Sequence, residues 1–145
     1  MSAAPAPGFY VERHYLKDLS FENPTGPVKI ENQGGIRTRV GGRINSRPLG
    51  REKLYCVETT LTIESQIDGR IIFLCELTYV ADVELTQVPQ QVQEQILSVD
   101  VPNFLMPQIN QVIDHAAKAG GFSELKIRKI DFLALYNNAR RRKKN

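Results

Sequence analysis

The chain has 145 residues, of which 41% are hydrophobic, so it can form one domain with a core of ordinary size. No apolar run approaches the ~20 residues that a membrane-spanning helix needs, and the N-terminus lacks the basic and apolar regions of a secretory signal. These features predict a cytoplasmic protein. Its net charge at pH 7 is small, +3. Cys56 and Cys75 lie inside strand-like runs and are expected to be buried free thiols.

The net charge conceals an uneven distribution. Seven cations and only two acids lie between Val28 and Lys53, and five further cations form the run Arg140–Lys144. The rest of the chain carries twice as many acidic as basic residues. The sequence therefore describes an acidic body with two basic segments, which bears on the partners it can bind.

The N-terminal third predicts two imperfect strands. Residues 1–8 are rich in Ala and Pro and are expected to be disordered. A strand-like pattern covers 9–21, and residues 28–35 have the composition of a crossover loop. Weak alternation returns over 36–44, where Gly41-Gly42 indicates a bend or bulge.

The middle of the chain predicts a hairpin of two strong strands. Residues 54–65 alternate most cleanly, and Asp68-Gly69 is typical of a tight turn leading into Arg70–Tyr79. In that second strand one face is wholly apolar, formed by Ile71, Phe73, Cys75, Leu77 and Tyr79. The opposite face is mixed, formed by Ile72, Leu74, Glu76 and Thr78. We expect the apolar face to be buried and something to dock on the second face.

Beyond Thr86 the pattern becomes helical. A short helix is expected over 89–97, and a longer one from Pro102 to the Gly120-Gly121 cap, with an irregularity near Pro107. A last helix is expected over 132–139, capped by Asp131, ahead of a basic tail at 140–145.

This order of elements predicts the fold class. Strands precede helices without βαβ alternation, which indicates an α+β fold: a four-stranded antiparallel sheet followed by a long helix and a C-terminal helix. We expect a single domain over residues 9–139. Its apolar residues are numerous for one sheet and two helices, so part of the surface is expected to pack on another subunit.

The sequence carries no catalytic motif. It contains no phosphate-binding loop, nucleophile elbow, HExxH or CxxC, and His14 and His115 are not at ligand spacing. We therefore expect neither an enzyme nor a bound metal or cofactor. The basic run at the C-terminus leaves a nucleic-acid-binding module as a minor alternative, although no aromatic-interleaved basic strand supports it.

Four segments resemble the SecB-type protein-export chaperones of bacteria, in that family's order. They are Tyr15–Pro24 (YLKDLSFENP), Phe73–Glu76 (FLCE), Pro102–Pro107 (PNFLMP), and Gly121–Leu125 (GFSEL) with Ile130–Tyr136 (IDFLALY). The resemblance implies a cytoplasmic homotetramer, a dimer of dimers that does not insert into membranes. It implies an ATP-independent holdase that binds unfolded preproteins and delivers them to the SecA ATPase.

The resemblance also assigns roles to three groups of residues. The surface that docks SecA corresponds to Asp18, Glu22, Leu74 and Glu76. The row associated with subunit packing corresponds to Phe73, Cys75 and Leu77. The aromatic-lined region that borders the groove for unfolded peptides corresponds to Phe122, Leu125, Phe132 and Tyr136.

The basic residues distinguish this chain from the usually acidic members of that family. The arginines at 37, 39, 43 and 47 are expected to line or flank the client groove and to favour acidic or less basic clients. A second hypothesis keeps the chaperone fold but not the export role: a SecB-like chaperone dedicated to one aggregation-prone partner, such as an antitoxin, without SecA.

Overall fold

The computed structural model describes residues 8–26, 35–122 and 130–144. Its elements in chain order are β1 (Gly8–Glu22), β2 (Ile36–Pro48), β3 (Leu54–Ile67), β4 (Arg70–Thr86), α1 (Gln90–Gln95), η2 (Ile96–Asp100), α2 (Val101–Ala119) and α3 (Phe132–Lys144). The strands form one antiparallel sheet in the order β1-β4-β3-β2. The predicted α+β class and strand number are therefore confirmed.

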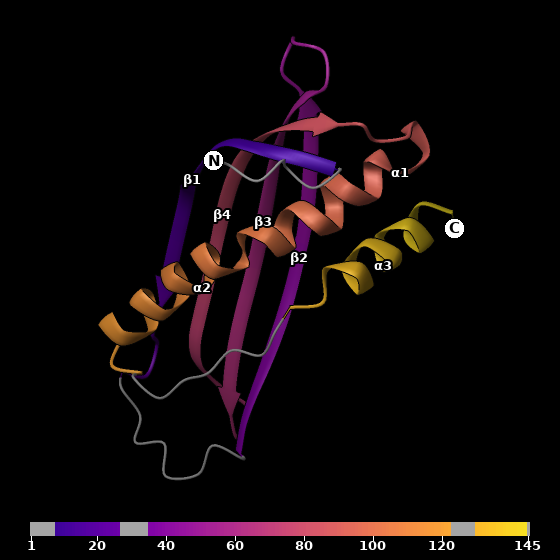
Figure 1. Ribbon diagram of the computed structural model, residues 1–145. Helices are drawn as coiled ribbons and strands as arrows, with labels where there is room; N and C mark the ends of the chain where they lie inside the picture. Colours follow the sequence, from indigo (N-terminus) through magenta and orange to yellow (C-terminus); the bar gives the residue numbers. More distant parts are fainter. Residues whose placement is uncertain (1–7, 27–34, 123–129, 145) are drawn as a thin grey trace.

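The helices cover one face of this sheet. Figure 1 shows α2 crossing the strands obliquely, with α3 beside β2. Apolar rows of β3 and β4, including Leu61, Ile63 and Leu77, are fully buried beneath them. We call this side the helix face. In the described ranges no helix or strand lies on the other side, which we call the open face.

The predicted faces of β4 are confirmed from Phe73 to Tyr79 but not before it. Ser65 of β3 pairs with Phe73 and Gln66 pairs with Ile71, so Ile72 is an extra residue in β4. This bulge turns Ile72 into the core at 2% exposure and leaves Ile71 37% exposed. The prediction that Ile71 is buried and Ile72 faces outward was therefore wrong.

Local signals for turns and helix starts are confirmed. Asp68 and Gly69 have φ values of 49° and 77°, as a tight hairpin with two left-handed residues requires. The carboxylate of Asp131 accepts a hydrogen bond of 2.9 Å from the Ala134 N–H, which caps α3.

The ends of the helices differ from the prediction. The first helix ends early, at Gln95, and η2 is a π-helical segment that leads directly into α2, which contains Pro107. Arg140–Lys144, expected as a tail, continues α3 as helix.

An aromatic cluster holds the C-terminal end of α2 against the sheet. The ring of Phe73 lies between those of Phe21 and Phe122, at centroid distances of 5.0 and 6.0 Å. The side-chain amide of Asn23 donates to the Gly120 carbonyl at 2.8 Å. Three of the four segments quoted above thus meet in one place.

Gly120 is required by this contact because a β-carbon there would lie 2.5 Å from Cζ of Phe21. Its φ of −83° suits any residue, so a larger side chain at position 120 is excluded by lack of space and not by backbone strain. We expect Gly120→Ala to lower the free energy of unfolding by ~1–3 kcal/mol, as overpacking does elsewhere. Urea unfolding monitored by circular dichroism measures it.

Gly41→Ala is the matched control, since a β-carbon at Gly41 meets nothing within 4 Å. It should change the free energy of unfolding by less than about 0.5 kcal/mol, as surface substitutions usually do. Equal effects of the two substitutions would contradict the clash with Phe21.

Candidate functional site

The open face carries an acidic patch centred on Leu74. Leu74 is half-buried and lies opposite Glu22 on β1 and Glu64 on β3. We define the acidic patch as Asp18, Glu22, Glu64, Leu74 and Glu76. The register of β1, β3 and β4 places all five side chains on the open face. The four residues assigned to SecA docking are therefore brought together.

The carboxylates of the acidic patch have no cationic partner among the described residues. Carboxylates elsewhere on the strands are paired: Asp82 with Arg13, Glu58 with Lys17, and both Glu12 and Glu84 with Arg51. Hydrogen bonding to Asp82, together with its negative charge, raises the pKa of Arg13 above its ordinary value. Uncompensated negative charge thus gathers around Leu74, which suits a cationic partner with an apolar contact.

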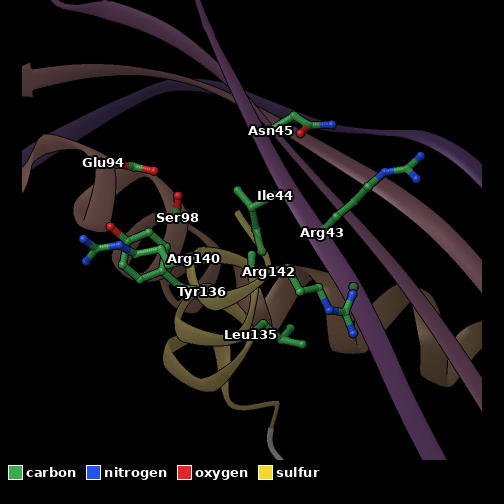
Figure 2. Close-up of a pocket in the computed structure, with 11 residues that line it drawn as sticks. Arg43, Ile44, Asn45, Glu94, Ser98, Leu135, Tyr136, Arg140 and Arg142 are labelled. Atoms are coloured by element: carbon green, nitrogen blue, oxygen red, sulfur yellow. The ribbon is translucent and has the colours of Figure 1, made fainter. Parts of the chain in front are cut away.

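Four arginines of β2 form an arginine row on the open face. The row consists of Arg37, Arg39, Arg43 and Arg47, which alternate with residues that face the helices. Figure 2 shows the Arg43 guanidinium pointing away from α3. Strand alternation directs the side chains of this row to the face opposite the helices. The expectation that they line or flank the client groove stays a prediction.

A cavity lies between β2 and α3. Its volume is about 290 Å³, and its lining comes from β2, α1, η2 and α3. The lining residues are Gly42, Arg43, Ile44, Asn45, Glu94, Ser98, Leu135, Tyr136, Ala139, Arg140 and Arg142. Figure 2 shows Ile44 extending from β2 toward α3. The Arg140 guanidinium lies 5.5 Å from the centroid of the Tyr136 ring. We call this space the β2–α3 cavity.

The residues assigned to the peptide groove lie in different places. Phe122 and Phe132 are core residues, 2% and 1% exposed, and Phe122 packs edge-on against Phe73. They offer no free surface in this conformation, because the sheet and helices of the same chain cover them. Tyr136 lines the β2–α3 cavity, and Leu125 lies outside the described residues. The binding role stays a prediction, which the geometry favours for Tyr136.

The residues assigned to subunit packing require a correction. Phe73, Cys75 and Leu77 are completely buried by elements of their own chain and leave no surface for another subunit. Exposed apolar side chains instead gather on β1, an edge strand: Tyr10, Tyr15, Leu16 and Leu19. Two bulges, at Glu12 and Lys17, reset the alternation of β1, and this is why its sequence pattern did not show which residues share a face.

The described residues hold no cluster of three or more His, Cys, Asp or Glu side chains that could bind a metal ion. No helix in the described ranges is long and apolar enough to cross a membrane.

Comparison with known proteins shows the family to which the chain belongs. Residues 2–143 match the family described as preprotein translocase subunit SecB. The protein-export protein SecB of Bradyrhizobium diazoefficiens is 33% identical, over 92% of this chain and 83% of that protein. The SecB of Magnetococcus marinus is 30% identical, over 97% and 89%. The chain belongs to the SecB family, which makes it a chaperone connected with protein export.

A solved structure shows the same fold. It is a SecB-like chaperone of Mycobacterium tuberculosis in complex with a peptide from an antitoxin. The TM-score is 0.69, over 86% of this chain and 91% of that one, at 8% sequence identity. At that identity the likeness concerns the fold alone.

The buried thiol of Cys75 should make stability depend on alkaline pH. Burial raises the pKa of Cys75 from its ordinary value near 9 to about 11. As pH rises from 9 to about 11, the thiol ionises in the unfolded chain but stays protonated in the folded one. We therefore expect the free energy of unfolding to be unaffected by this group below pH 9 and to fall above it.

Cys75→Ala removes this contribution, although its cavity lowers stability at every pH. The difference between the two proteins in free energy of unfolding should be constant below pH 9 and should shrink toward pH 11. Denaturant unfolding across that range measures it. A constant difference throughout would show that burial does not perturb the thiol.

Proposed function

We propose that the protein is an ATP-independent holdase that binds extended, unfolded segments of preproteins and delivers them to the SecA ATPase. The observation that carries the proposal is the β2–α3 cavity, with Ile44, Leu135 and Tyr136 in its lining, beside an edge of β2 that pairs with no other described strand. An aromatic and aliphatic lining recovers burial energy, ~25 cal/mol per Å² of apolar area, without requiring a particular client sequence.

The acidic patch is our candidate for the SecA contact. Leu74 supplies an apolar centre, and Glu22, Glu64 and Glu76 surround it with negative charge. A cationic segment with one apolar residue would find complementary chemistry there, and the charge would guide its approach. The patch lies on the open face and the cavity lining includes Tyr136 of α3 on the helix face, so a client and SecA would not compete for the same surface.

Assembly into a homotetramer, a dimer of dimers, is part of the proposal. The exposed apolar residues of β1 lie along a sheet edge whose outer side pairs with no described strand. A second β1 can satisfy this edge while covering Leu16 and Leu19. Several client sites on one tetramer would turn weak individual contacts into avid binding.

Client holding is tested by the aggregation of an unfolded preprotein, followed by light scattering without ATP. The wild-type protein should suppress aggregation, and Leu135→Asn should suppress it several-fold less, because an amide in the β2–α3 cavity weakens apolar contact. Ala134→Asn is the control: Ala134 is exposed on the same helix and does not line the cavity. Circular dichroism checks that both variants are folded. Equal suppression by all three proteins would move the client site away from this cavity.

Delivery is tested by size exclusion with light scattering on the protein mixed with SecA. We expect a complex whose affinity falls at least about tenfold on Leu74→Arg or Glu76→Lys. The first substitution places a positive charge at the apolar centre of the patch, and the second reverses one of its negative charges. Glu52→Lys makes the same charge change at an exposed position outside the acidic patch and should leave the complex intact. Client holding without any SecA complex would favour the dedicated-chaperone hypothesis.

A further inference from the structure

We propose that the free edge of β2 accepts a client segment as a fifth strand, and that it selects segments in which apolar and acidic residues alternate. The inference rests on the proposed client-binding function and specifies the chemistry of the segment. It follows from three features of β2: an unpaired edge, the β2–α3 cavity on one side, and the arginine row on the other.

The first feature is the edge itself. β2 is the last strand of the sheet and pairs only with β3 among the described residues. Its 13 residues, Ile36–Pro48, therefore direct alternate backbone N–H and C=O groups outward. Such an edge is a template for an extended peptide, whose backbone would gain hydrogen bonds without regard to its sequence.

The second feature gives an added strand an apolar side. Gly42 and Ile44 of β2 line the β2–α3 cavity together with Leu135 and Tyr136 of α3. The α3 helix approaches β2 closely here: a β-carbon on Gly42 would lie 3.5 Å from a methyl group of Leu135. Alternate side chains of a strand beside β2 would point toward this lining and bury apolar surface there.

The third feature gives the added strand an acidic side. Arg37, Arg43 and Arg47 face Gln66, Thr60 and Cys56 across the ladder, and only Arg39 faces a carboxylate, that of Glu64. In the part of the chain that the structure describes, none of the four forms an ion pair. Acidic residues opposite them on a fifth strand would supply the missing charge, because directly opposed pairs interact across a sheet.

Cations on an edge strand have another known effect, which is to block unwanted pairing. The arginine row would repel a basic strand, but it would attract an acidic one. Blocking and selection therefore make opposite predictions for an acidic peptide. Removing the arginines should weaken its binding if they select, and strengthen the binding of all peptides if they only block.

The test uses four fluorescent nonapeptides and the full-length protein in an anisotropy titration. In three of them isoleucine alternates with glutamate, glutamine or lysine. The fourth, the block peptide, has the same residues as the alternating glutamate peptide, with all isoleucines in one block and all glutamates in another. We expect the alternating glutamate peptide to bind about tenfold more tightly than the lysine peptide, since several weak exposed ion pairs add. The block peptide should bind more weakly, and salt should reduce the preference.

Two variants and one modified peptide locate the site. The double variant Arg39→Gln, Arg43→Gln should bind the alternating glutamate peptide only as tightly as it binds the glutamine peptide. Arg70→Gln, which removes an exposed arginine near the β3–β4 turn, should not. N-methylation of alternate backbone amides should abolish binding of the glutamate peptide if it pairs as a strand.

Three results would overturn the inference. The first is equal binding of the three alternating peptides, the second is tighter binding of all peptides to the arginine variant, and the third is indifference to N-methylation. If an unfolded preprotein is still held in those cases, the proposed function stands and only the strand-addition site fails. If neither preprotein nor peptide binds, the proposed function itself fails.

Discussion

The structure depends on the packing of α2 across one face of the sheet. The buried rows of β3 and β4 meet Leu105, Ile109 and Ile113 of α2, all of which are essentially inaccessible to water. The aromatic cluster around Phe73 fixes the C-terminal end of that helix. Because the helices pack on one face, the other face and both edges of the sheet are not covered by a described helix or strand.

This one-sided core separates the chemistry of the two faces. Away from the bulges, neighbours along a strand point to opposite faces, so the acids and arginines on the open face are held at fixed spacing. The acidic patch spans β1, β3 and β4, and the arginine row lies on β2 at the far edge. The open face therefore changes sign from one edge to the other, and cationic and anionic segments would bind at opposite ends of it.

The sequence predicted those parts of the fold that local patterns determine. Asp68-Gly69 specifies the turn between β3 and β4, and Asp131 specifies the cap of α3. The period-two pattern specifies the buried row of β4 from Phe73 to Tyr79. Four family segments correctly indicated the family. They also contain Asp18, Glu22, Leu74 and Glu76, which the structure brings together and whose docking role stays a prediction.

The sequence could not show which surface covers an apolar residue. Phe73, Phe122 and Phe132 are apolar whether a helix, a client or a second subunit packs on them, and in the structure the chain itself does so. Bulges are equally hidden, because one inserted residue at Ile72 or Lys17 exchanges faces without changing composition. The cavity beside Tyr136 depends on the approach of α3 to β2, a tertiary contact with no local signal.

The two sheet edges differ in how readily each can pair with the same edge of a second copy of the chain. β1 exposes Tyr10, Leu16 and Leu19, whereas β2 presents the arginine row. Two β2 edges would bring like charges together and repel each other, while two β1 edges can bury apolar surface. A chaperone that must leave one edge open for extended clients has to prevent its own copies from occupying that edge. The arginine row would do this through its charge, and it would still leave the edge open to an acidic segment.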